Sequence, residues 1–198
     1  MSAPIPIGPI LIGISTDCLH ERPLDTSAPH FAELIVASNY SFLRGASHPA
    51  DLLERAAALG MTAIGIADRN SVAGVVRAHS AWRALGGAAP EFRLVVGARL
   101  VFADGTPDII AYPATRAGWG RLTRLLTLGN RRTEKGDCLL RLDDLLSHAQ
   151  DLLLIMMPNG DASDAVVLET LSQACPTRVW IAATMPRGGA DARRLARG

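Results

Sequence analysis

The sequence predicts an α/β fold in which most strands pair in parallel, and two features of the chain carry this prediction. Short apolar runs alternate with amphipathic segments of helical length, which is the pattern of parallel strands joined by right-handed crossovers. Polar residues follow directly after the apolar runs, at the strand ends where α/β folds usually place their sites. Both features are clearest in residues 31–79, where a strand, a loop and a helix follow one another twice.

The first of these two units comprises an apolar strand at 31–37 and, after a loop, an amphipathic helix. Ser47 is the expected N-cap of the helix, and Pro49 fits its first turn. Gly60 ends the helix. The apolar side chains between these signals recur at helical spacing, so we expect Leu53 on this face to be a core residue.

The second unit comprises a buried strand at 61–67, with Ile64 in the core, and a helix at 71–85. Asp68 and Asn70 follow the strand, and either side chain could cap this helix because both residue types are strong N-caps. We assign the cap to Asn70 and leave the role of Asp68 open.

The rest of the chain continues the alternation and adds one antiparallel hairpin. Asp104 and Gly105 are a hairpin signal between a strand at 94–102 and a returning strand at 107–113. Thr115 is the expected cap of a third helix. The remaining predicted elements are helices at 139–147, 163–174 and 191–198 and strands at 151–157 and 177–183.

Composition and charge exclude several classes of protein. The chain has 198 residues, of which 48% are apolar and 20% are charged, values that are ordinary for one globular domain. The formal net charge of +1 argues against a strongly electrostatic nucleic-acid binder. No apolar run is long enough to cross a membrane, so we expect no membrane partner.

The cysteines and prolines add two further expectations. Cys18, Cys138 and Cys175 are isolated in the sequence, which favours reduced thiols in a cytoplasmic protein and gives no zinc-like spacing. Residues 1–29 carry five prolines and little periodicity. They are therefore predicted to be an irregular extension that precedes a domain at 30–198.

Five stretches in a fixed order carry a resemblance to a known family: AEL (32–34), SNYSFLRGASHP (38–49), GIADRNSVAGVVRAH (65–79), GARL (97–100) and TLGNRRTEKGDC (127–138). They resemble the PHP (polymerase and histidinol phosphatase) domain of bacterial C-family, DnaE-like DNA polymerases, and most closely the error-prone branch. The resemblance implies a distorted (β/α)7 barrel. The family's domain is longer than the matched stretch, and the polymerase palm has no match, so we expect a truncated PHP-like domain with an incomplete barrel.

Metal-binding members of this family gather histidines and acids at the strand ends, and the resemblance implies that this chain lacks most of them. Ile35 and Ala37 stand where those members have a His-x-His pair. Arg69 stands at the position of a third histidine, and Arg99 at that of a glutamate. Guanidinium groups stay protonated and do not coordinate metals. Asp68 is the one retained acid, and it could pair with either arginine if it is not a cap. We therefore expect a degenerate metal site, no cofactor and no catalytic residue.

The resemblance implies a structural PHP module of an error-prone DNA polymerase, from a nucleotidyltransferase family that serves DNA replication, repair and translesion synthesis. Whether this chain is itself an enzyme stays open. The expected partners are the remaining polymerase domains or other damage-tolerance proteins, with DNA contacted only indirectly. The alternatives are a metal-dependent phosphoesterase or exonuclease of the PHP family and a small nucleic-acid-binding protein.

Support for the last alternative comes from one locally basic segment, in which Glu134 is the only acid. A solvated helix face is the preferred interpretation of this segment, and a patch that contacts phosphates or docks onto another polymerase domain is the functional one. Its cationic residues are Arg116, Arg121, Arg124, Arg131, Arg132 and Lys135.

Overall fold

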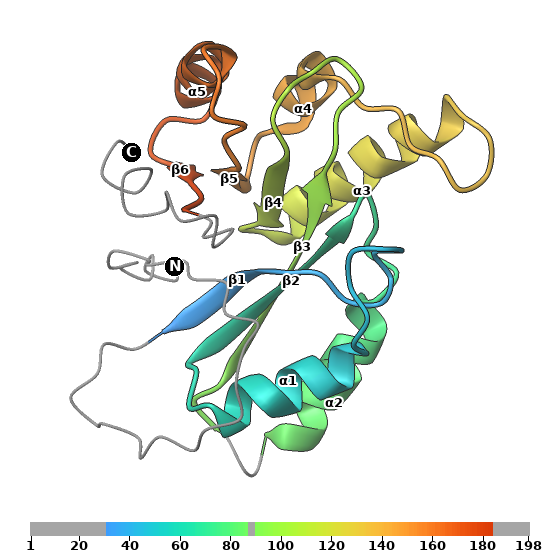
Figure 1. Cartoon of the computed structure of the whole chain (residues 1–198), viewed down its shortest axis with the longest axis vertical. Helices are drawn as coiled ribbons and strands as arrows, with labels where there is room; N and C mark the ends of the chain where they lie inside the picture. The colour runs from blue at the N-terminus through green and yellow to red at the C-terminus, as the bar shows by residue number, and fades with distance from the viewer. Residues whose placement is uncertain (1–30, 87–89, 184–198) are drawn as a thin grey trace.

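The computed structural model describes residues 31–86 and 90–183, and its centre is a six-stranded sheet. The strands lie in chain order across the sheet (Figure 1). They are β1 (Ala32–Val36), β2 (Ala63–Arg69), β3 (Arg93–Leu100), β4 (Ile109–Pro113), β5 (Leu152–Met156) and β6 (Val179–Ile181). The helices are α1 (Pro49–Ala58), α2 (Val75–Leu85), α3 (Arg116–Arg131), α4 (Leu142–His148) and α5 (Ser163–Ala174). The predicted extension at 1–29 and the helix at 191–198 lie outside the described residues.

The strand pairing confirms the predicted α/β class and its antiparallel return. The strands β1, β2 and β3 are parallel neighbours, and β5 is parallel to β6. Between them, β4 runs antiparallel to both β3 and β5, after a turn in which Gly105 has a φ of +85°. The sheet is curled, and β1 and β6 are its edges among the described residues, which is consistent with an incomplete PHP-type (β/α) barrel (Figure 1).

Helices cover the outer side of the sheet in two groups (Figure 1). The helices α1 and α2 pack on the half that contains β1 to β3, where Leu53 is 0% exposed and Ile64 is 2% exposed, as predicted. The helices α3, α4 and α5 pack on the other half, where Leu122, Leu145 and Leu171 are fully buried. A separate apolar cluster lies on the inner, concave side and contains Ile35, Ala67, Ile110, Tyr112, Ile155 and Ala182.

Tyr112 crosses the concave side and joins β4 to β1. Its ring lies over Gly65 and Gly97, because a Cβ atom at those positions would come within 2.3 Å of the Tyr112 hydroxyl and 2.6 Å of its ring, respectively. The hydroxyl donates a hydrogen bond of 2.6 Å to the Leu34 carbonyl. Two glycines therefore make room for a contact across the sheet that the sequence did not predict.

The start of α1 differs from the prediction. Its N-cap is His48 rather than Ser47, and the His48 N–H donates to the Asp51 carboxylate at 3.3 Å. Ser47 remains in the loop because its carbonyl accepts the Asn39 N–H at 2.9 Å, which closes the base of that loop.

The start of α2 also corrects the prediction, because Asn70 does not cap this helix. Asn70 has a φ of +46°, and its amide bonds both backbone groups of Val101. The Val101 N–H donates to Oδ1 at 2.9 Å, and Nδ2 donates to the Val101 carbonyl at 3.3 Å. The helix begins only at Val75, after Gly74, with no side-chain cap. Asn70 instead turns the chain at the end of β2 and ties it to the end of β3.

The other predicted helices agree more closely. Thr115 caps α3, since its Oγ1 accepts the Gly118 N–H at 3.0 Å. The helix α5 has its predicted bounds. The helix α4 begins at Leu142, three residues later than predicted, because the Leu140 carbonyl is held by the Ala103 N–H at 2.9 Å. None of the described helices is both long enough and apolar enough to span a membrane.

Candidate functional site

The candidate site lies where the carboxyl ends of β1, β2 and β3 meet at one edge of the sheet. Ile35 belongs to the concave apolar cluster, and Ala37 directly follows the end of β1. Arg69 and Arg99 are register partners on β2 and β3. Each arginine is an even number of residues from a glycine on its own strand, Gly65 or Gly97, and therefore points to the same side of the sheet as that position. Tyr112 lies over both glycines on the concave side, so the two arginines also project from the concave side. The structure thus brings three of the five predicted positions, Ile35, Arg69 and Arg99, to one side of three adjacent strands, and Ala37 lies at the end of the first of these strands.

The two arginines at this edge differ in their ion pairing. The Arg99 guanidinium binds the Asp108 carboxylate, with Nε and Nη2 at 2.7 Å and 2.6 Å from the same oxygen. Arg69 is exposed and forms no ion pair with a described residue. Arg99 is therefore already balanced by an acid that the sequence did not single out, while the charge of Arg69 faces solvent.

Asp68, the fifth predicted position, faces the opposite side of β2. It shares the parity of Ile64 and Ile66, which pack against the helices, and it lies beside Gly74 at the start of α2. Asp68 is 1% exposed. Of the roles left open for Asp68, pairing with Arg69 or Arg99 is not observed among the described residues, since both arginines project from the other side of the sheet.

The Asp68 carboxylate instead accepts three hydrogen bonds from the loop after β1. The Ser38 N–H and hydroxyl donate at 2.8 Å each, and the Ser41 hydroxyl donates at 2.6 Å. Ser41 Oγ in turn accepts the Arg69 N–H at 2.9 Å, so β2 holds the loop at two points. Sequence reasoning missed both serines. One signal in the sequence could have pointed to them. The loop after β1 contains these two serines, and the neighbouring parallel strand β2 has Asp68 near its end, so the hydroxyl groups and the carboxylate lie at the same edge of the sheet.

Glu33 on β1 is a second acid near this region, and unlike Asp68 it is only half-buried. Burial raises its pKa above the usual value of 4.5, although its carboxylate accepts the Ile35 N–H at 2.9 Å. Burial also raises the pKa of Tyr112, helped by the negative charges of Glu33 and Asp68. The Tyr112 hydroxyl therefore stays protonated and serves as a donor to β1.

Histidines and cysteines supply no cluster at this edge. Within residues 31–86 and 90–183, no three His, Cys, Asp or Glu side chains gather closely enough to hold a metal ion. His48 is exposed and contacts the Asn39 amide at 3.0 Å, and the His79 ring lies 5.8 Å from the Trp82 ring. Burial raises the pKa of the two described cysteines, Cys138 and Cys175, and both are free thiols.

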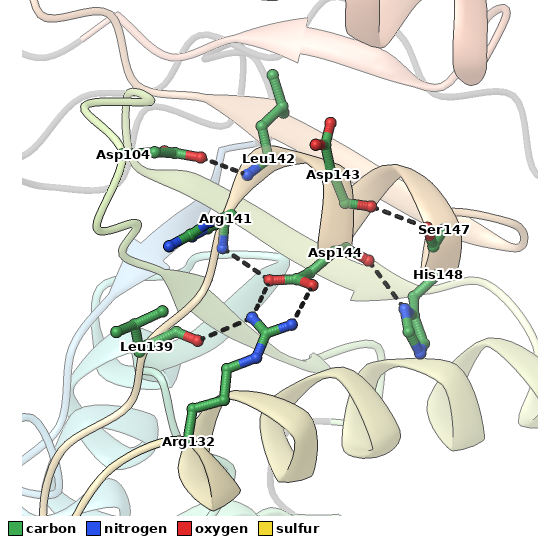
Figure 2. A network of polar contacts seen from close by, with 9 residues as sticks. All are labelled: Asp104, Arg132, Leu139, Arg141, Leu142, Asp143, Asp144, Ser147 and His148. Carbon is green, nitrogen blue, oxygen red and sulfur yellow. Dashed lines mark hydrogen bonds and ion pairs between the residues drawn. The ribbon is translucent and has the colours of Figure 1, made fainter.

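Two cations of the basic segment are neutralised by acids. Arg121 pairs with Asp151 at 2.6 Å. Figure 2 shows Arg132, directly after α3, reaching Asp144 in the first turn of α4, with Nη2 at 2.8 Å from Oδ1. This hydrogen bond from Arg132 holds the pKa of Asp144 below its usual value. Both arginines therefore connect α3 to its neighbours and are poorly placed to bind a ligand.

The remaining arginines of α3 form one exposed stripe. Arg116, Arg124 and Arg131 recur at spacings of eight and seven residues, which places them on one face of the helix. All three are exposed and form no ion pair with the described part of the chain. The helix contains no acidic residue. We call these three residues the α3 stripe.

Comparison of this chain with known proteins identifies its family. The PHP domain model matches residues 33–183. An error-prone DNA polymerase of Brucella abortus is 50% identical over 172 residues, which are 85% of this chain and 16% of that protein. An error-prone DNA polymerase of Rhodopseudomonas palustris is 48% identical over 174 residues, 85% of this chain and 15% of that protein. This chain thus spans only a small part of the polymerases that it matches.

Comparison with solved structures shows a likeness of the fold alone. An amidohydrolase from Chromobacterium violaceum, with bound sulfate and no metal, superposes with a TM-score of 0.55 at 16% sequence identity. The match covers 84% of this chain and 81% of that protein.

Proposed function

The chain belongs to the PHP domain family, and from this premise we propose that it is the PHP module of an error-prone DNA polymerase, with a degenerate metal site and a structural role. The 50% identity to the Brucella abortus protein over 85% of this chain supports the assignment to that polymerase. The structural role would be to pack against the other polymerase domains and hold them in place.

The observation that carries the structural role is the chemistry of the concave edge. Divalent cations need imidazole, carboxylate or thiolate ligands that converge from several strands. At this edge, Ile35 and Ala37 have no lone pair to offer, and Arg69 and Arg99 carry permanent positive charge. Asp68 faces the helices, and its oxygens are occupied by Ser38 and Ser41. These side chains do not fit the metal ions of the family, so no step of a metal-assisted hydrolysis is assigned to them.

The rigid packing of the module supports a scaffolding role. Both sides of the sheet are filled with apolar side chains, and the Tyr112 hydroxyl ties β4 to β1 at 2.6 Å. A close-packed interior deforms little, so surfaces on its different sides keep a fixed distance and orientation. A module of this kind can fix the relative placement of neighbouring domains without contributing a catalytic group.

A graft tests this proposal directly. The matching segment of the Brucella abortus polymerase would be replaced by this chain, and primer extension would be measured on undamaged and lesion-containing templates. We expect the graft to extend primers at a rate within a few-fold of the unaltered polymerase, while deletion of the segment abolishes extension. A graft that is folded but inactive would contradict the proposal. This chain alone should not extend a primer, since its sequence has no match to a polymerase palm.

The α3 stripe supports a second candidate function, a direct contact with nucleic acid. Its arginines are spaced along about 22 Å of helix, given a rise of 1.5 Å per residue, and could each meet one phosphate. With a formal net charge of only +1, the chain would bind through this local stripe rather than through its overall field. Few aromatic side chains lie among these cations, so base stacking is not part of this candidate function.

A further inference from the structure

Two large apolar side chains stand exposed at the tip of the loop after β1. Phe42 is 82% exposed and Leu43 is 88% exposed, and they are neighbours in the chain. Leu43 also has a φ of +60°, in the left-handed region that residues with a Cβ rarely adopt. Single exposed apolar residues are ordinary, but an adjacent pair on a strained backbone is a feature of binding sites.

The loop below this tip is held firmly. The Arg44 and Gly45 N–H groups both donate to the Ser41 carbonyl, at 2.9 Å and 3.0 Å, and form a tight turn behind the tip. Ser41 itself is anchored on buried Asp68. At Gly45, a Cβ atom would come within 2.2 Å of the Ser38 carbonyl oxygen, so the loop closes on itself without room for a side chain. These contacts hold the base of the loop on both sides of the tip, so less conformational entropy would be lost when a partner binds the tip.

The surroundings of the tip define the surface that would fit it. The loop packs against the start of α2, because Tyr40 and Ser38 approach within 3.0 Å and 3.3 Å of the position of a Cβ at Gly74. Val76, two residues after Gly74 in the first turn of α2, is a further large apolar side chain that is 74% exposed. The exposed cations Arg44 and Arg77 directly follow Leu43 and Val76 in the sequence, and the backbone N–H of exposed Arg69 donates to Ser41 of the same loop. A complementary surface would be an apolar pocket with an acidic rim.

We propose that Phe42 and Leu43 form a docking anchor that inserts into an apolar, acid-rimmed pocket on another domain of the same polymerase polypeptide. This inference rests on the proposed function. The chain covers 16% of the Brucella abortus polymerase, so most of that polypeptide lies outside the match and is available as the partner. Two side chains bury too little area to hold free proteins together, but they suffice for domains joined by one chain, where the effective concentration is high. Covalent linkage thus favours this occupant over a second copy.

The test uses the polymerase graft described above and the double substitution Phe42→Ser and Leu43→Ser. Both side chains are largely exposed, so the melting temperature of the isolated chain should change little. In the graft, we expect the double substitution to raise the rate of proteolytic cleavage between the PHP segment and the next domain at least tenfold. The matched control is Val166→Ser on α5, which is 65% exposed and lies far from the loop in sequence; it should leave the cleavage rate unchanged.

Hydrogen exchange gives a second readout. The amides of residues 42 and 43 should exchange more slowly in the graft than in the isolated chain, and the difference should vanish in the double variant. Equal cleavage rates for the graft and its double variant, with equal exchange at the loop, would overturn the docking proposal. If primer extension by the graft is normal in that case, the proposed function stands and only the anchor is refuted. An inactive graft that still protects the loop would refute the proposed function and leave the anchor supported.

Discussion

At the residue scale, Asp68 has a structural task in the loop after β1. In the sequence it is the one acid at the positions that the resemblance to PHP domains implies for metal ligands, and it follows a strand in an α/β fold. In the structure it faces away from the concave edge and organises the loop that carries Phe42 and Leu43. The role of the Asp68 carboxylate is therefore to hold that loop in position.

The substitution Asp68→Ala tests this role. It removes the acceptor for the Ser38 and Ser41 groups, and we expect a loss of roughly 2–4 kcal/mol in the free energy of unfolding, since each buried donor left unpaired costs about 1–3 kcal/mol. The measurement is urea unfolding at pH 7. Glu54→Ala, at an exposed position on α1, is the control and should change stability little. An effect of Asp68→Ala as small as that of the control would show that the loop does not depend on this carboxylate.

A pH-dependent effect is expected at Glu33. Burial raises the pKa of this carboxyl above the usual 4.5, so the folded state binds its proton more tightly than the unfolded state does. The resulting destabilisation is absent below pH 4.5, grows as the pH rises through the folded pKa and is complete above it. Glu33→Gln removes the charge but keeps an oxygen that can accept the Ile35 N–H. The variant should therefore gain stability relative to the natural chain between pH 4 and pH 7; a gain that is independent of pH would contradict the assignment.

At the scale of elements, sequence reasoning succeeds where periodicity is strong and fails where long-range hydrogen bonds decide. The strands, the hairpin and α5 follow from apolar runs and turn residues, and Thr115 caps α3 as expected. The predicted N-cap residues of α1 and α2, Ser47 and Asn70, were wrong. Both residues are instead held by hydrogen bonds to backbone groups elsewhere in the chain, at Asn39 and Val101. At the candidate site, the concave positions could be placed from the resemblance and strand parity. The Arg99–Asp108 pair and the serine contacts of Asp68 could not, since they depend on the register between strands.

The packing of α1 gives a stability prediction at this scale. Leu53 is fully buried between α1 and the outer side of β2. Leu53→Ala should lower the free energy of unfolding by about 2–5 kcal/mol, because the removed atoms leave a cavity in a close-packed core. Leu59→Ala, at the exposed end of the same helix, is the control. Thermal or urea unfolding that shows a loss well under 1 kcal/mol for Leu53→Ala would mean that α1 is not anchored by this side chain.

The α3 stripe gives a prediction about nucleic acid. If its three arginines contact phosphates, the logarithm of the affinity for single-stranded DNA should fall with the logarithm of salt concentration with a slope of about −2, since each contact contributes about −0.7. Fluorescence anisotropy with a labelled oligonucleotide measures this slope. Replacing Arg116, Arg124 and Arg131 by Gln should flatten the slope. The control triple, Arg55, Arg77 and Arg83 to Gln on α1 and α2, removes the same charge and should not. Equal slopes for both triples would assign the stripe to solvent or to an acidic protein partner.

At the scale of the whole molecule, the described residues form one curled sheet with helices on its outer side and apolar side chains on its concave side. This arrangement keeps the framework of a PHP domain while the concave edge offers apolar and cationic groups. The loop after β1, which Asp68 holds on the helix-covered side, presents two exposed apolar side chains, Phe42 and Leu43. The proposed degenerate metal site and the proposed docking tip would both suit a module that positions other domains.

We propose that the concave edge binds no divalent cation, and the metal content of the purified chain tests this most directly. The purified chain would be dialysed against buffer containing zinc and manganese, then against metal-free buffer, and analysed for both elements. Arg99 is already paired with Asp108, but a cation near Arg69 would still be repelled by about 4 kcal/mol per unit of its charge at ~4 Å and an effective dielectric of ~20. We predict well below one ion per chain, with no change in Asp68→Ala. About one tightly held ion per chain, released by Asp68→Ala or accompanied by manganese-dependent hydrolysis of a chromogenic phosphoester, would contradict the account.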